Sequence, residues 1–121
     1  MERVLGLGGA FFKARDPQAL AAWYREHLGV PVEVGATHGA FISGNQGETL
    51  VWSTFPADTE YFGPGPAQCM LNYRVANLDA MLAQLRAAGA QVEDGVEDYD
   101  YGRFGWATDP EGNRFELWEP R

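Results

Sequence analysis

The feature that most constrains the fold is an internal repeat with a period of sixty residues. The segment 29–33, which contains Gly29, Val32 and Glu33, returns at the same spacing as the segment 89–93. Each copy follows a predicted amphipathic helix, and each helix follows a predicted strand. A chain of 121 residues with such a repeat is expected to be one domain built from two similar modules.

Both predicted helices carry their own start and stop signals. Asp16 followed by Pro17 is typical of an N-cap with proline at the first helical position, and Gly29 ends this helix. Asn77 caps the second helix and Gly89 stops it. Each helix has one apolar stripe, formed by Leu20, Trp23, Tyr24, His27 and Leu28 in the first and by Leu78, Met81, Leu82 and Leu85 in the second.

Strand-like segments surround each helix in the same order, with one before it and three after it. They are residues 7–14, 32–34, 40–43 and 49–54 in the first half, and 70–75, 91–96, 103–108 and 114–118 in the second. The fold class is therefore α+β, with two β-α-β-β-β modules in a single domain over residues 1–121. Module one covers about residues 1–55, a proline-containing linker about 56–68, and module two about 69–121.

The last strand presents a carboxylate directly after a tight turn. Pro110 fixes φ at one corner of this turn, and Gly112 can adopt the positive φ that the reversal requires. Side chains then alternate between the two faces of the strand. Phe115 and Leu117 are expected on one face, and Arg114, Glu116 and Trp118 on the other.

Composition excludes several classes of function. Nine basic against seventeen acidic residues give a net charge of −8, which repels phosphate backbones, so nucleic acid is not an expected partner. No apolar run approaches the roughly 20 residues of a membrane span, and no signal peptide is evident. Cys69 is the single cysteine, so no internal disulfide is possible, and a cytoplasmic location is expected.

These motifs together resemble the vicinal oxygen chelate superfamily, which includes glyoxalase I, bleomycin-resistance proteins, extradiol dioxygenases and fosfomycin-resistance enzymes. In that superfamily two β-α-β-β-β modules form a sheet curled into a cup that holds the site, with the helices on its outer face. The resemblance rests on residues 11–16, Trp23-Tyr24, Leu28-Gly29, residues 77–89, the turn 109–113 and Glu116-Leu117.

The resemblance also implies four positions for metal ligands, one in the first and one in the last strand of each module. In this chain they fall on Gly9, Trp52, Met70 and Glu116. Glycine and tryptophan cannot ligate a metal, and a thioether is a poor ligand for hard divalent ions, so only Glu116 remains. We therefore expect no cofactor and no tightly bound metal, although a weakly held divalent ion at Glu116 stays open.

Strand parity sorts the remaining side chains into a core face and a ligand face. The core face is predicted to hold Phe12, Val51, Leu71, Tyr73, Val75, Phe115 and Leu117. The candidate ligand-binding residues are Phe11, Trp52, Met70, Asn72, Arg74, Tyr101, Trp106 and Trp118. Packing of this face against a second subunit is the alternative.

Two interpretations of the segment 97–106 are open. It is either a mobile aromatic segment that covers a ligand or a solvated acidic loop. Arg103 in this segment is predicted to point inward and to pair with Glu116 or with a substrate anion. Glu116 and Arg103 are therefore the candidate catalytic residues.

Three functions remain open at this point. The first is a homodimeric protein that binds a small molecule, as bleomycin-resistance proteins do. The second is a lyase, isomerase or dioxygenase-type enzyme that uses Glu116 as general base, with Arg103 or Arg74 stabilising an oxyanion. The third is a degenerate structural or regulatory relative. We favour the first.

Overall fold

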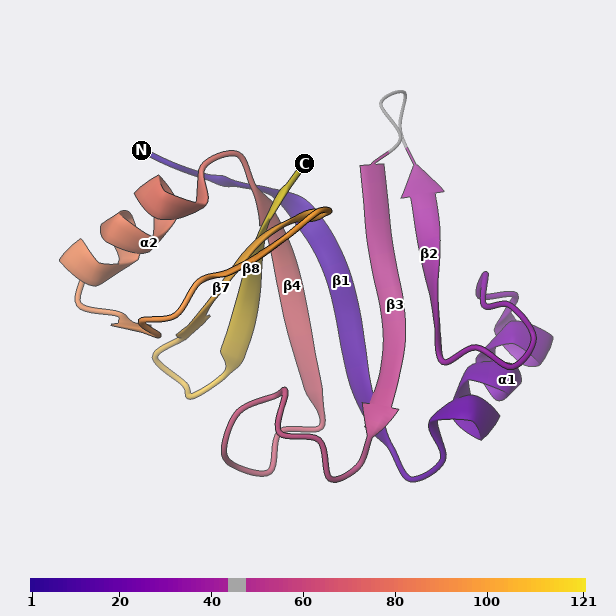
Figure 1. The fold of residues 1–121 in the computed structure, drawn as a ribbon. Coiled ribbons are helices and arrows are strands. Elements are labelled where there is room, and N and C mark those ends of the chain that lie inside the picture. The colour runs from indigo at the N-terminus through magenta and orange to yellow at the C-terminus, as the bar shows by residue number, and fades with distance from the viewer. Residues whose placement is uncertain (44–47) are drawn as a thin grey trace. The chain divides into compact units, whose positions relative to one another are not determined.

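The computed structural model describes residues 1–43 and 48–121, which form two helices and eight strands (Figure 1). These residues divide into two compact units. The N-terminal unit contains residues 9–69, and the C-terminal unit contains residues 1–8 and 70–121. Strand β1, Val4–Ala14, contributes residues to both units. Each unit contains one helix together with strands, which confirms the α+β fold class.

The N-terminal unit follows β1 with helix α1, Pro17–Leu28, and strands β2, His38–Ser43, and β3, Glu48–Pro56. Strand β3 lies between the other two strands, parallel to β1 and antiparallel to β2 (Figure 1). Residue Gly9 of β1 pairs with Val51 of β3, and this pairing sets the register of the unit.

Helix α1 begins and ends where the sequence predicts. The Asp16 side chain accepts a hydrogen bond of 3.1 Å from the Ala19 amide, and Gly29 closes the helix with φ at 69°. The helix covers an apolar cluster in which the buried residues Ala21, Val30, Val32 and Trp52 are joined by Phe12 and Tyr24.

The C-terminal unit contains one helix and the last five strands. Their bounds are Cys69–Val75 for β4, Leu78–Ala87 for α2, Gln91–Val92 for β5, Glu97–Tyr99 for β6, Gly102–Thr108 for β7 and Arg114–Pro120 for β8. Strand β8 pairs with β4 in parallel and with β7 in antiparallel orientation, and β7 also pairs with β5 and β6.

Helix α2 packs on one face of β4 and β8. Its N-cap Asn77 accepts a hydrogen bond of 3.0 Å from the Ala80 amide, as predicted. The cluster beneath the helix consists of Val75, Leu78, Met81, Leu82 and Leu117, joined by Tyr73, Leu85, Val92 and Phe115. Leu71 is an exception, because it is 39% exposed and lies outside this cluster.

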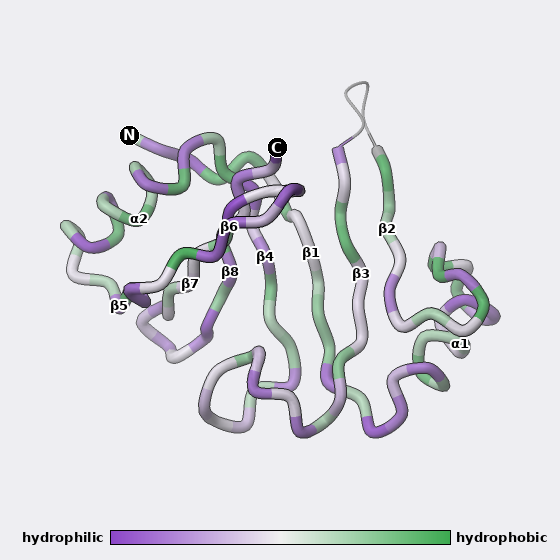
Figure 2. Tube along the Cα trace, viewed as in Figure 1, coloured by the Kyte–Doolittle hydropathy of each residue, from purple (hydrophilic) through white to green (hydrophobic). Residues whose placement is uncertain are grey.

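Two predicted strands are shorter than expected. The segment 32–34 forms only an isolated bridge between Val32 and Gly39, because the chain turns where the Ala36 amide donates to the Glu33 carbonyl. Of the segment 91–96, only Gln91 and Val92 form a strand, β5, and β6 begins after the end of that segment. The hydrophilic segment that begins at β6 is drawn in purple in Figure 2.

Candidate ligand-binding site

The parity of β8 places Glu116 on the face of the strand opposite helix α2. Leu117 belongs to the α2 cluster, whereas Glu116 is directed away from it and is only 1% exposed. Across the strand ladders, Glu116 pairs with Asn72 of β4 and with Trp106 of β7. Three strands therefore bring these side chains together. We call the side of the strands that carries them the Glu116 face.

Both carboxylate oxygens of Glu116 accept hydrogen bonds from these neighbours. Asn72 Nδ2 donates to Oε1 at 2.6 Å, and Trp106 Nε1 donates to Oε2 at 2.9 Å. All three side chains are buried. Hydrogen bonds to an ionised acceptor are short and strong, and they offset part of the cost of removing the carboxylate from water.

Asn72 leaves one polar atom without a partner. Its Oδ1 is buried, and it is the one buried side-chain nitrogen or oxygen in the described part of the chain for which no hydrogen bond is found. Such an acceptor costs about 1–3 kcal/mol. A buried acceptor beside a buried carboxylate is a polar feature that a ligand bearing N–H or O–H groups could complete.

Gly8 of β1 makes room for this arrangement. A Cβ atom at Gly8 would lie 2.3 Å from Asn72 Oδ1, 2.8 Å from the Trp118 ring and 2.9 Å from Arg74 Cγ. Sequence reasoning missed Gly8. Glycine inside a strand often marks a close approach of another group to the backbone, and that signal could have identified it.

Arg114 lies over the Trp106 ring. Its guanidinium lies 5.4 Å from the ring centroid and donates to Glu93 at 2.7 and 2.9 Å. A third nitrogen of the same guanidinium lies 3.5 Å from Met70 Sδ. The hydrogen bond from Arg114 lowers the pKa of the Glu93 carboxyl below its ordinary value of 4.5.

Arg74 and Trp118 extend the Glu116 face and pair with each other across β4 and β8. Arg74 Nη1 donates to the Leu7 carbonyl at 2.7 Å, and Trp118 Nε1 donates to the Tyr101 carbonyl at 3.2 Å. The Trp118 ring stacks on Phe104 at 6.0 Å with an interplanar angle of 4°. Five predicted ligand residues, Met70, Asn72, Arg74, Trp106 and Trp118, are therefore gathered around Glu116, and their ligand roles stay predictions.

Tyr101 lies at the exposed end of the same unit. Its side chain is 60% exposed, stacks on Tyr99 at 5.3 Å and contacts the edge of Phe104 at 5.7 Å. Its carbonyl accepts the hydrogen bond from Trp118. The backbone of Tyr101 thus positions a residue of the Glu116 face, while its ring lies largely in water.

The predicted pair between Arg103 and Glu116 is wrong. Arg103 donates to Asp79 in helix α2 at 3.0 and 3.2 Å and lies 3.8 Å from Asp98. The parity of β7 explains this, because Trp106 faces Glu116 and Arg103 points to the opposite side of the strand. The hydrogen bond from Arg103 lowers the pKa of Asp79 below its ordinary value of 3.8.

Trp52 also lies on the other face from the one predicted. Its ring packs 4.8 Å from Tyr24 of helix α1 and 5.8 Å from Phe12, and it is 6% exposed. In the observed register, Val51 and not Trp52 pairs with Gly9, so Val51 faces away from α1. A slip of one residue in the predicted register reverses every side chain of the strand.

Phe11 lies on the face of the N-terminal unit opposite the α1 cluster, as predicted. Its ring contacts Phe55 at 5.5 Å and Tyr61 at 6.5 Å. Phe55 and Tyr61 stack on each other at 5.3 Å. Sequence reasoning assigned Tyr61 to the linker and Phe55 to the end of module one, and it missed their contact with Phe11.

Residues 1–43 and 48–121 contain no group of three or more His, Cys, Asp or Glu side chains that could hold a metal ion. The one carboxylate of the four ligand positions, Glu116, has both oxygens in hydrogen bonds to protein donors. The absence of a tightly bound metal stays a prediction. No helix of the described residues is long and apolar enough to cross a membrane.

Comparison with known proteins identifies the family to which the chain belongs. The sequence model of the glyoxalase-like domain matches residues 9–118. No curated protein matches the chain.

Solved structures with the same fold have low sequence identity to the chain. A methylmalonyl-CoA epimerase of Streptomyces coelicolor, solved in complex with 2-nitronate-propionyl-CoA, has a TM-score of 0.74 at 17% identity, over 98% of this chain and 99% of that one. The methylmalonyl-CoA epimerase of Mycobacterium tuberculosis has a TM-score of 0.67 at 20% identity, over 98% and 89%. A glyoxalase/bleomycin resistance protein/dioxygenase superfamily member of Vibrio splendidus 12B01 has a TM-score of 0.62 at 12% identity, over 98% and 99%.

The ion pair of Glu93 with Arg114 predicts a pH-dependent contribution to stability. Because the pKa of Glu93 is lower in the folded protein than its ordinary 4.5, its contribution is fully present above that pH. It is lost as the pH falls through the lowered pKa. Urea denaturation of Glu93→Gln and the unaltered protein should show a difference in unfolding free energy at neutral pH that shrinks well below pH 4.5.

The matched control is Glu111→Gln, the same substitution at an exposed position of the same unit. It should change the unfolding free energy little at either pH. A Glu93→Gln effect of equal size at both pH values would show that the ion pair contributes nothing through its charge.

Proposed function

Because the chain belongs to the glyoxalase-like domain family of the vicinal oxygen chelate superfamily, we propose that it binds a small organic molecule on its Glu116 face. The observation that carries this proposal is the buried carboxylate of Glu116 beside the unpartnered Asn72 Oδ1. An acceptor that lacks a donor, beside a buried carboxylate, calls for a ligand that donates hydrogen bonds. The net charge of −8 favours the approach of a cationic ligand.

Aromatic side chains around these acceptors favour a planar ligand. Trp106 is held by hydrogen bond to Glu116, and Trp118 is held against Phe104. Indole rings attract cations and stack on planar groups. A planar molecule that carries cationic N–H groups is the chemical class that fits both the acceptors and the rings.

The same geometry argues against Glu116 as general base in an enzyme. A general base must accept a proton from the substrate, and each oxygen of Glu116 already accepts a hydrogen bond from a protein donor. The predicted assistance from Arg103 is also absent, since that guanidinium binds Asp79. Binding without proton abstraction is therefore the function that we propose.

Benzamidine, a planar cation with N–H donors, tests this proposal. We expect it to bind the unaltered protein in a ligand-observed NMR titration, and Glu116→Gln to weaken that binding about tenfold, because a hydrogen bond to a charged group is lost. Neutral benzamide should bind more weakly than benzamidine.

Glu111→Gln again serves as the matched control and should leave benzamidine binding unchanged. Circular dichroism of Glu116→Gln is needed beside the titration, because an amide at this position faces two donors and leaves one of them without an acceptor. If the folded variant binds benzamidine as tightly as the unaltered protein does, Glu116 is not part of a ligand site.

We further propose that this binding needs no tightly held metal. Of the four positions that the superfamily uses for ligands, Glu116 alone carries a ligating side chain. Addition of nickel, zinc, manganese or iron should therefore leave the melting temperature unchanged, as measured by calorimetry. A rise in melting temperature that Glu116→Gln abolishes would establish a metal site instead.

A homodimer is the assembly that we propose. Strand β2 pairs with β3 alone among the described strands, and it exposes Phe41 at 42% and Ile42 at 73%. An unpaired strand edge with apolar side chains is a surface that proteins usually cover. Light scattering should give twice 13.3 kDa, and a mass of one chain would refute the dimer.

A further inference from the structure

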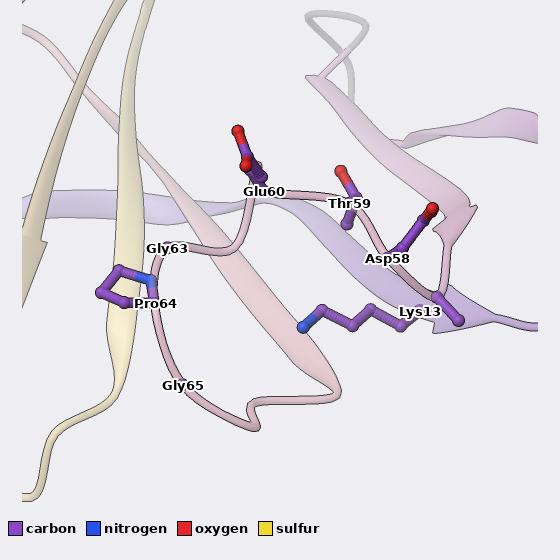
Figure 3. Close-up of a pocket in the computed structure, with 8 residues that line it drawn as sticks. Lys13, Asp58, Thr59, Glu60, Gly63, Pro64 and Gly65 are labelled. Atoms are coloured by element: carbon purple, nitrogen blue, oxygen red, sulfur yellow. The ribbon is translucent and has the colours of Figure 1, made fainter.

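The N-terminal unit contains a pocket, formed around Lys13 by the loop that follows β3. Its volume is about 490 Å³, which lies within the range of small-molecule sites. The lining consists of Lys13, Ala57, Asp58, Thr59, Glu60, Gly63, Pro64 and Gly65. In Figure 3, the Lys13 side chain extends into the space that this loop encircles.

Lys13 is the only lysine of the chain, and its side chain is held in place by contacts other than ion pairs. Its ammonium lies 5.5 Å from the ring centroid of Phe62, which is 2% exposed. Its backbone amide donates to the Gln68 carbonyl at 2.9 Å and joins the end of the loop to β1. The ammonium thus lies near a buried aromatic ring, and the strand that carries it is joined to the end of the loop.

No carboxylate of the residues that the structure describes lies within 4.0 Å of the Lys13 ammonium, although the chain carries seventeen acidic residues. Two of these, Asp58 and Glu60, line the same pocket, and both are exposed. Figure 3 shows their carboxylates pointing away from Lys13. Lys13 therefore offers three hydrogen-bond donors and a positive charge to a molecule inside the loop.

The loop is organised by its own hydrogen bonds before any ligand binds. The Thr59 amide donates to the Pro56 carbonyl at 3.0 Å, and the Gly63 amide donates to the Glu60 carbonyl at 3.0 Å. The Tyr61 amide donates to Thr59 Oγ1 at 3.2 Å. A pocket that is largely formed in advance requires little ordering when a ligand enters.

We propose that this pocket binds a small monocarboxylate through Lys13. A carboxylate accepts charge-assisted hydrogen bonds from the ammonium, and Pro64, Ala57 and the methylene groups of Lys13 receive a compact apolar body. The negative charges of Asp58 and Glu60 at the rim disfavour ligands with two or more negative charges, phosphate included.

The single lysine makes the experiment simple. Protein labelled with [¹⁵N]lysine gives one backbone amide signal, that of Lys13, in a two-dimensional NMR spectrum. Titration with benzoate should shift this signal to saturation. Benzamide, which has the same shape without the charge, should bind about tenfold more weakly, and inorganic phosphate should bind more weakly than benzoate.

Variants of Lys13 and of the rim residues test whether charge determines the affinity for benzoate. Because Lys13→Gln removes the amide probe, its benzoate affinity is measured by ligand-observed NMR, and it should fall about tenfold relative to the unaltered protein. Lys13→Arg keeps the charge and should keep binding within a few-fold. The double variant Asp58→Asn with Glu60→Gln replaces exposed rim residues, so it should fold normally, bind benzoate more tightly and admit phosphate.

Glu116→Gln is the control that separates this site from the site proposed above. It should leave benzoate binding unchanged while it weakens benzamidine binding. The proposal is overturned if benzamide binds as tightly as benzoate, if Lys13→Gln binds benzoate with unchanged affinity, or if the rim variant has the same preference for benzoate over phosphate.

Discussion

The hydrogen bonds of the buried Glu116 carboxylate are the interaction on which the rest of the C-terminal unit depends. A carboxylate that is 1% exposed is tolerated in a folded protein only when its oxygens are satisfied. The two donors come from different strands, Asn72 on β4 and Trp106 on β7. A shift of either strand by one residue would turn its donor to the opposite face. The carboxylate therefore selects one register for three strands and at the same time forms the polar centre of the candidate site.

This requirement extends to residues beyond the two donors. Trp106 can donate to the carboxylate only in one ring orientation, and Arg114 contacts that ring while it is paired with Glu93. Asn72 can donate to Glu116 only if there is space for its Oδ1 atom. That space exists because Gly8 lacks a Cβ atom. The buried Asn72 Oδ1 remains a destabilising feature within an otherwise satisfied network. In the proposed function, the ligand supplies the donor that this acceptor lacks.

The sequence predicted the parts of the fold that are encoded locally. Caps at Asp16 and Asn77 define both helix starts, and the alternation of Phe115, Glu116 and Leu117 defines the faces of β8. The predicted faces of Trp52 and Arg103 are wrong, and both lie in strands where apolar and polar residues do not alternate. Apolar residues occupy consecutive positions in the segment 50–52, so its face depends on pairing with β1, which is a long-range contact. In β7 the consecutive residues Phe104 to Ala107 are all buried, so apolar and polar side chains do not alternate. The sequence therefore did not show which face of the strand carries Arg103.

Several arginines of the C-terminal unit are engaged by other groups of the protein. Arg103, Arg114 and Arg121 are engaged by carboxylates in two-point contacts, a geometry that the planar guanidinium favours and that anchors neighbouring elements of the fold. Arg74 is held by a backbone carbonyl. Lysine has a compact charge without that fork, and the one lysine of the chain is placed over a ring instead of against a carboxylate. The carboxylates of Asp58 and Glu60 in the surrounding loop point away from Lys13, and in our proposal this leaves its charge available to a ligand.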